Sequence, residues 1–234
     1  MSVLTNTASI ELAGENALIV YFKQDKLIEA NKKISQLTAI LKLCPDNHII
    51  DLIPSYISLL IIFDPINTDY WAIKRLVALS LSSEQQESTI TSKVIDIPVF
   101  YSIQTGPELN LIANQAGLSV DEVIHIHQQN MYQVFGLGFA PGFAFLGEVD
   151  ERIATPRLAT PRQKVPKGAV GIADRQTAIY PTMSPGGWNL IGICPLSLFD
   201  PSTSPYIPFT VGDKVKFNAV SKQEFIALGG QLGG

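Results

Sequence analysis

Charge, cysteine and long apolar runs are all scarce in this sequence. Only 16% of the 234 residues are charged and the net charge is −4, which argues against nucleic acid as the main partner. The two cysteines, Cys44 and Cys194, form no CxxC pair, so we expect a reducing compartment and no metal site. No run approaches 18 apolar residues and the first residues do not resemble a signal peptide. We therefore expect a cytoplasmic protein that does not act at a membrane.

Several familiar binding motifs are also missing. The sequence has no GxxxxGK[ST] and no GxGxxG at the start of a predicted helix, which excludes the usual P-loop and dinucleotide sites. It has no Met-Lys pair, so a typical biotin attachment site is absent. Any nucleotide is therefore expected to bind in some other way or on another chain.

The cations gather in one part of the chain. Between residues 152 and 175, six cationic side chains stand against a single acid, Asp174. They are Arg152, Arg157, Arg162, Lys164, Lys167 and Arg175. This segment is predicted to receive an anion, which would be a substrate carboxylate, a phosphate or an acidic patch on another protein. A solvated loop without a ligand is the alternative.

Hydrophobic periodicity predicts a small α+β domain over residues 1–86. Strand and helix patterns follow in the order ββαββα, which is compatible with helices packed on one face of an antiparallel sheet. The strands are expected within residues 9–22, 49–53 and 56–63, and the helices over 27–41 and from about 67 to 81. Asp25 is expected to cap the first helix, and Asn67 or Thr68 the second. Residues 82–89 are polar and are predicted to form the linker.

A second domain is predicted over residues 87–234. A strand is expected from residue 94 to 100, a helix from 106 to 116, and a further helix opened by the capping box of Ser119 and Glu122. After Met131 the sequence predicts mostly short strands, with turns at 141–142, 166–168, 184–187 and 211–213. That spacing is typical of a closed or nearly closed β-barrel.

The stretch from 136 to 192 combines much of the glycine and proline of the chain with aromatic side chains. Glycines allow close approach of a backbone or ligand, and the aromatic rings supply apolar area. Pro141-Gly142 predicts a type II turn, placed at a corner between strands. Gly186 and Gly187 are expected to turn Trp188 inward and to offer N–H groups to an oxyanion. A bend in a β-rich core is the alternative.

Two histidines lie on the helix that Ser119 opens. His125 and His127 are two residues apart, which places them about 200° apart around a helix, so they cannot share a metal ion. Val123 and Ile126 compete with His125 for the core, so His127 is expected to project into a pocket. A surface or interface histidine with satisfied hydrogen bonds is the alternative.

Several short motifs in this half of the chain resemble one protein family. They are His127–Tyr132, Gly138–Gly147, Pro156-Arg157, Pro161–Pro166, Gly168–Ile172, Gln176–Pro181, Ser184–Trp188 and Ile191-Gly192. In this order and spacing they resemble the family of the B-type subunit of 5-oxoprolinase, also called the KipI or allophanate hydrolase subunit 1 family. The resemblance extends less sharply over residues 106–201.

The resemblance implies a fold and an activity. The expected fold is α+β, with a small ferredoxin-like ββαββα amino-terminal domain followed by a cyclophilin-like β-barrel domain. Family members hydrolyse 5-oxo-L-proline to L-glutamate with ATP, together with a sister carboxyltransferase-like barrel subunit of the KipA type and a LamB/YcsF-like subunit. The KipI branch instead inhibits histidine kinase autophosphorylation. A carboxyltransferase-like or allophanate-hydrolase-like component acting on another amide is the third alternative.

The resemblance also suggests residue roles. His127 and Tyr132 are the candidate catalytic residues, because they can transfer a proton. Candidate substrate-binding or anion-binding residues are Arg157, Arg162, Gln176, Tyr180, Ser184, Gly186, Gly187 and Trp188, and candidate pocket-wall residues are Phe139, Pro141, Gly142 and Phe143. The chain has Ile193-Cys194 where the family pattern has Arg-Thr, and Ala169 where it has Ser. Loss of that arginine removes a cation from the edge of the site, so the motifs leave the substrate open.

Overall fold

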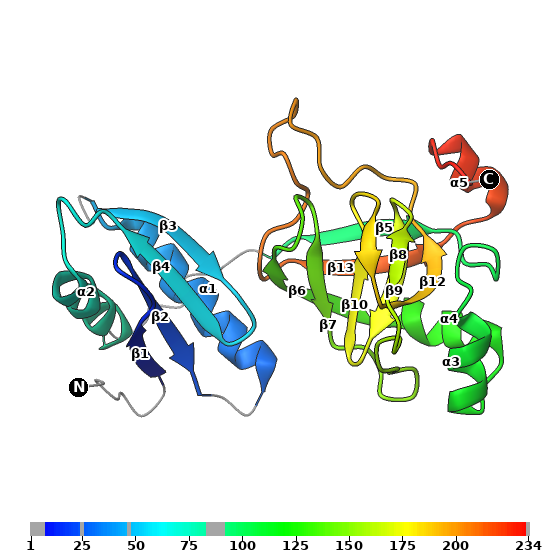
Figure 1. Cartoon of the computed structure of the whole chain (residues 1–234), viewed down its shortest axis with the longest axis horizontal. Coiled ribbons are helices and arrows are strands. Elements are labelled where there is room, and N and C mark those ends of the chain that lie inside the picture. The colour runs from blue at the N-terminus through cyan, green and yellow to red at the C-terminus, as the bar shows by residue number, and fades with distance from the viewer. Residues whose placement is uncertain (1–7, 24–25, 46–47, 83–91, 233–234) are drawn as a thin grey trace. The chain divides into compact units, whose positions relative to one another are not determined.

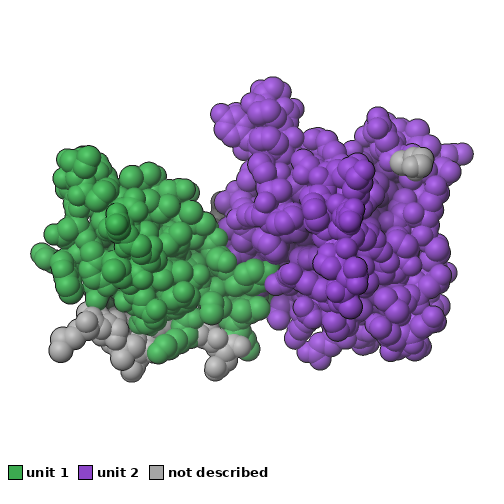
Figure 2. All heavy atoms as spheres, in the orientation of Figure 1, with its two compact units in different colours: residues 1–92 green, residues 93–234 purple. Residues whose placement is uncertain are grey.

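The computed structural model describes residues 8–23, 26–45, 48–82 and 92–232 (Figure 1). The chain divides into two compact units, residues 1–92 and residues 93–234 (Figure 2). The predicted boundary between residues 86 and 87, and the predicted linker beyond Ser82, lie outside the described residues. None of the described helices has the length and apolar character needed to cross a bilayer.

Unit 1 is a four-stranded antiparallel sheet with two helices (Figure 1). Its elements are β1 (Ala8–Leu12), β2 (Ala17–Phe22), α1 (Leu27–Leu43), β3 (Ile49–Pro54), β4 (Ser58–Phe63) and α2 (Tyr70–Ser82). The strands lie in the order β1-β2-β4-β3. The predicted element order ββαββα is confirmed, whereas the ferredoxin-like detail stays a prediction.

One face of this sheet is buried against the helices. Leu18 and Val20 of β2 share a core with Ile34 and Leu37 of α1, because alternate residues of a strand and every third or fourth residue of a helix face the same way. The side chain of Asp69 caps α2, accepting a hydrogen bond of 2.8 Å from the Ala72 N–H.

The cap of α2 differs from the prediction. The structure assigns the α2 cap to Asp69 instead of Asn67 or Thr68, because α2 begins at Tyr70. The predicted cap of α1, Asp25, lies outside the described residues.

Unit 2 is built on a seven-stranded sheet in the order β12-β9-β10-β7-β6-β13-β5. These strands are β5 (Val94–Val99), β6 (Met131–Leu137), β7 (Ala144–Gly147), β9 (Ala169–Ala173), β10 (Gln176–Ile179), β12 (Asn189–Ile193) and β13 (Lys214–Ala219). The two outermost strands meet where Phe100 and Ile193 exchange backbone hydrogen bonds of 2.8 and 3.0 Å. The sheet is therefore a nearly closed barrel, as predicted, and the cyclophilin-like detail stays a prediction.

Three helices and a small second sheet complete unit 2. The helices are α3 (Leu109–Ala116), α4 (Val120–Gln129) and α5 (Lys222–Ala227), and the second sheet pairs β8 (Arg162–Val165) with β11 (Ser184–Gly186). The predicted capping box is present at α4. The predicted turn at 184–187 is wrong over its first three residues, because these are extended and pair with β8.

The strands β9 and β10 carry a different apolar cluster on each face. Val170, Ile172 and Ile179 belong to the cluster inside the barrel, which we call the inner cluster. Alternate residues belong to a second cluster on the other face, which we call the outer cluster. Its buried members are Phe143, Val165, Ala169, Ala173, Ala178, Tyr180, Trp188 and Leu190. The sheet is thus buried on both faces here, and β8 contributes to the outer cover through Val165.

Candidate functional site

The loop between β6 and β7 borders the outer cluster. The two strands pair antiparallel, so residues 138–143 close a hairpin, and the predicted corner between strands is wrong. The Phe143 N–H donates to the Ala140 carbonyl at 2.9 Å and Gly142 has a φ of 84°, which confirms the type II turn over Pro141-Gly142. Phe139 has a φ of 71° and is 65% exposed. A strained backbone that presents an exposed aromatic ring beside a buried cluster suggests a ligand contact.

Phe143 lies at the centre of the aromatic part of this cluster. Its ring centroid lies 5.5 Å from that of Tyr180 and 5.9 Å from that of Trp188, both nearly edge to face. The centroid of the exposed Phe139 ring lies 5.1 Å from that of Phe143. Such contacts stabilise by about 0.5–1.5 kcal/mol each beyond area burial. Trp188 is buried, as predicted, so the rings form a fixed wall.

Arg157 lies over this wall. Its guanidinium carbon is 5.8 Å from the centre of the Trp188 ring, a cation–π distance. The backbone fixes the arrangement, because the Leu158 N–H donates to the Gly187 carbonyl at 2.7 Å. The Gly187 carbonyl is therefore an anchor for the segment that carries the arginine.

Asn189 provides a second anchor that the sequence analysis missed. Its side-chain amide donates to the carbonyls of Pro156, at 2.8 Å, and Ile172, at 3.2 Å. The residue before Arg157 is thereby tied to β9. The side-chain oxygen of Asn189 is buried without a hydrogen-bond partner. A single asparagine within a β pattern carries no sequence signal for such a contact.

Arg162 is held by a second residue that the sequence did not reveal. It forms an ion pair with Glu108 and donates to the Trp188 carbonyl at 3.4 Å. The other carboxylate oxygen of Glu108 accepts the Leu190 N–H at 2.9 Å, and Glu108 is buried. Glu108 and Arg162 are 54 residues apart, so spacing alone could not pair them.

The phenol of Tyr180 lies within the electrostatic influence of both Arg157 and Arg162. Burial raises the pKa of its phenol, while the charges of Arg157 and Arg162 and a hydrogen bond from the Trp188 backbone act in the opposite direction. Gly186 lies against the phenol, and a β-carbon at this position would overlap the oxygen of Tyr180. The structure thus brings several of the predicted binding residues together around one phenol.

Two more predicted residues lie on this side of the sheet. Ser184 opens β11, and its hydroxyl is buried without a hydrogen-bond partner. Gln176 opens β10 opposite Ala173, and alternation places it on the same face as Ala178.

His127 and Tyr132 lie elsewhere, in the barrel core. His127 is fully buried, with its Nδ1 atom 2.8 Å from the Tyr101 hydroxyl and its Nε2 atom 3.0 Å from the Thr177 hydroxyl. Burial lowers the pKa of His127 to about 3. The Tyr132 hydroxyl donates to the His127 carbonyl at 2.9 Å. His127 does point inward as expected, but into the barrel core and not into a pocket.

The sheet therefore separates the two predicted groups of site residues. Thr177, which contacts His127, alternates along β10 with Ala178 of the outer cluster, so the two residues face opposite sides. The pair His127 and Tyr132 holds α4 and β6 together in this structure. A catalytic role for the pair stays a prediction that would require these side chains to leave their partners.

A cavity of about 680 Å³ adjoins the site next to β8. Arg162, Lys164 and Lys167 line it, together with Ile193 and Cys194, the pair at which the expected family pattern has Arg-Thr. Burial raises the pKa of the Cys194 thiol to about 11, so this thiol is not a nucleophile at neutral pH. Among the described residues, no group of three or more His, Cys, Asp and Glu side chains is placed to hold a metal ion.

Comparison with solved structures defines the class by fold. The chain superposes on part of Kluyveromyces lactis urea carboxylase with a TM-score of 0.76, over 94% of this chain and 22% of that chain. The identity is 20%, so this likeness concerns the fold alone. Residues 8–209 match the model of the carboxyltransferase domain, subdomain C and D. The chain belongs to this family.

Relatives of higher identity refine this assignment. The chain is 36% identical to the B-type subunit of Bacillus subtilis 5-oxoprolinase, over 96% of this chain and 98% of that protein. It is 39% identical to the Escherichia coli O157:H7 protein of the same name, over 88% and 93%. Among solved structures, TTHA0988 is 34% identical with a TM-score of 0.78. The match covers 89% of this chain but only 40% of TTHA0988.

Proposed function

We propose that this protein is the B-type subunit of an ATP-dependent 5-oxoprolinase, which hydrolyses 5-oxo-L-proline to L-glutamate in the cytoplasm. The observation that carries the proposal is the match to the Bacillus subtilis protein of that name, which extends over 96% of this chain and 98% of that protein. The Escherichia coli relative has the same name. Partners are a sister carboxyltransferase-like barrel subunit and a LamB/YcsF-like subunit.

The chemistry of the reaction suits the outer-face site. Opening a lactam breaks a resonance-stabilised amide, and ATP drives this step when the lactam oxygen is phosphorylated before water attacks. The substrate also carries a carboxylate, so its site needs cations and hydrogen-bond donors. In this proposal Arg157, held over the Trp188 ring, binds an anionic group, and the exposed ring of Phe139 contacts the apolar part of the substrate.

Arg162 has a different part in the proposal. Its charge is matched by the buried carboxylate of Glu108, so its main role is to position the wall at Trp188. Its remaining N–H groups donate hydrogen bonds to an anion. Proton transfer is assigned to a group on another subunit, because both ring nitrogens of His127 already have partners.

The described residues offer groups for the phosphates of ATP but no ligand cluster for its metal ion. The cations beside β8 suit a phosphate or carboxylate group, whereas the described residues offer no cluster of metal ligands for the cation that accompanies a nucleotide. We therefore propose that the nucleotide site is completed by partner subunits. When bound there, ATP supplies the phosphoryl group that activates the lactam oxygen.

The test is ATP-dependent release of glutamate from 5-oxoproline. The purified chain is combined with the sister and LamB/YcsF-like subunits, and the assay is repeated with each one omitted. Activity that needs all three supports the proposal. Lack of activity from folded, associated subunits contradicts it.

A matched variant tests whether this chain acts on the same substrate as the 5-oxoprolinase subunits that it resembles. Ile193→Arg with Cys194→Thr restores the family pattern at the cavity. If this chain acts on 5-oxoproline, the wild-type complex is active without the change. Activity that appears only in the double variant would show that the natural chain serves another amide.

A further inference from the structure

The cavity beside β8 contains two lysines to which the proposed function assigns no individual contact. Lys164 and Lys167 are exposed and line it. Among the described residues, neither forms an ion pair with a carboxylate, and Lys167 contacts only the hydroxyl of Ser197, at 3.4 Å. The third cation, Arg162, is paired with Glu108. The cavity is therefore lined by two lysine charges, those of Lys164 and Lys167, without a paired carboxylate.

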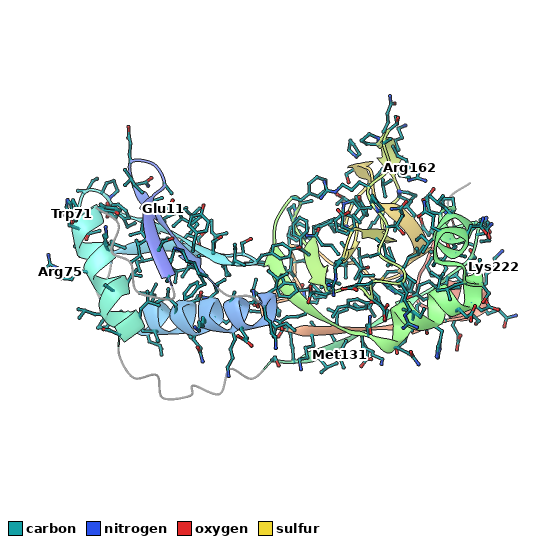
Figure 3. The ribbon with its side chains drawn as sticks, turned by 90° about the horizontal axis from the view of Figure 1, so that it is seen from below. Glu11, Trp71, Arg75, Met131, Arg162 and Lys222 are labelled. Carbon is teal, nitrogen blue, oxygen red and sulfur yellow. The ribbon has the colours of Figure 1, made fainter. Side chains whose placement is uncertain are left out.

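The strand β8 explains why these charges gather there. Arg162 and Lys164 are two residues apart and point to the same side of the strand, whereas Val165 points to the outer cluster. The cavity thus meets β8 on the side of Arg162 and Lys164, and it also reaches Leu190 of the outer cluster. Figure 3 labels Arg162, the first residue of β8, and Lys222, the first residue of α5.

Another part of the lining is mostly apolar. It includes Leu190, Ile193 and Phe225, followed by the segment 229–232. After α5 the chain turns in a Schellman motif, since Gly230 donates to the Phe225 carbonyl and Gly229 to the Ile226 carbonyl. Gly229 has a φ of 88°, which suits glycine in this motif. The motif directs the following residues along the cavity.

We infer that this cavity binds a small organic anion, whose phosphate or carboxylate lies between Lys164 and Lys167 and whose apolar part lies against Leu190 and Phe225. Its volume of about 680 Å³ is in the usual range for small-molecule sites. The inference rests on the proposed function for the choice of ligands. That reaction involves two sources of such a group, the phosphates of ATP and the carboxylate of 5-oxoproline or glutamate.

The test is isothermal titration of the full chain, without partners, with ATP, pyrophosphate, 5-oxoproline and glutamate in turn. Binding of at least one probe is expected, and the probe that binds identifies the source of the anion. The variant Lys164→Gln with Lys167→Gln should weaken that binding at least about tenfold, because charge-assisted hydrogen bonds are lost. Both side chains are exposed, so folding should be retained.

A matched control removes the same charge elsewhere. Lys32→Gln with Lys42→Gln changes two exposed lysines of α1 in unit 1 and should leave the affinity unchanged. The inference is overturned if none of the probes binds below about 10 mM, or if the two double variants bind equally well. Glutamate release by the assembled complex is scored separately. Binding without turnover would contradict the proposed function alone, and turnover without binding would overturn the cavity inference alone.

Discussion

The two faces of β9 and β10 belong to the same strands but have different surroundings. On the inner face, Val170 and Ile172 pack in the barrel core with the buried ring of His127 nearby. On the outer face, Ala173 and Ala178 leave room for the rings of the aromatic wall. The inner face is sealed and apolar, whereas the outer face carries cations and an exposed ring at its rim. The barrel core and the proposed binding site thus lie on opposite sides of one sheet.

This comparison predicts different responses to substitution. A change on the inner face should lower the free energy of unfolding, and activity should fall only because the fold is lost. A change at the rim of the outer face should lower binding or activity while the fold stays intact. Arg162 lies between these cases, because its partner Glu108 is buried.

The largest effect is expected for His127→Ala. This change removes a fully buried ring and leaves the hydroxyls of Tyr101 and Thr177 without their partner, so the free energy of unfolding should fall by about 3–5 kcal/mol. Urea unfolding monitored by circular dichroism measures it. His125→Ala, an exposed neighbour on the same helix, is the control. A His127 variant that is stable but inactive would instead support a catalytic role for this residue.

A smaller effect on stability is expected for Arg162→Ala. The change leaves the carboxylate of Glu108 without its ion-pair partner, so the free energy of unfolding should fall by about 1–3 kcal/mol. Arg157→Ala is the matched comparison, because Arg157 is exposed and stacks on Trp188. Its unfolding free energy should change by no more than about 0.5 kcal/mol, while glutamate release falls. Equal losses of stability in the two variants would contradict the claim that substitutions at the exposed rim spare the fold.

The last effect concerns pH, and it is small only near neutrality. The pKa of His127 is about 3 in the folded protein and about 6.5 in the unfolded chain, so the unfolded chain binds the proton first. The stability that neutral His127 provides is complete above about pH 6.5 and is lost as pH falls towards 3, by up to about 1.4 kcal/mol per pH unit.

Chemical unfolding at several pH values measures this contribution. His127→Phe keeps a ring and removes the titrating group, so the difference in stability between wild type and variant should become smaller or change sign as pH falls. A difference that stays constant from about pH 7 to 4 would show that His127 does not titrate as the burial requires.

The sequence predicted local structure better than long-range contacts. The ββαββα order, the capping box at Ser119 and the turn at Pro141-Gly142 are confirmed, because each depends on neighbouring residues. The nearly closed barrel followed from the spacing of short strands. The pairing of β11 with β8 was missed, since Pro185 and the following glycines resemble a turn whenever the partner strand is unknown.

The candidate site was predicted in its composition but not in its geometry. Arg157, Tyr180 and Trp188 do meet, and the motifs that suggested them lie close in sequence. The sequence could not place His127 on the other side of the sheet, because that depends on which alternate residues of β10 face inward. It also gave no sign of Glu108, which comes from a different segment and reaches the site through the fold alone.

The pairing of β5 with β13 has a consequence for how the protein is made. Val94 of β5 pairs with Lys214 of β13, so the ribosome must add about 120 residues before these partners can meet, which takes on the order of 10 s. Until then β5 has no strand beside it on the side that β13 will cover, whereas β1 and β2 of unit 1 can pair as soon as both emerge. A nascent chain that stops before residue 214 would therefore be an unclosed sheet with free edges, a substrate for chaperones and proteases and not a smaller barrel.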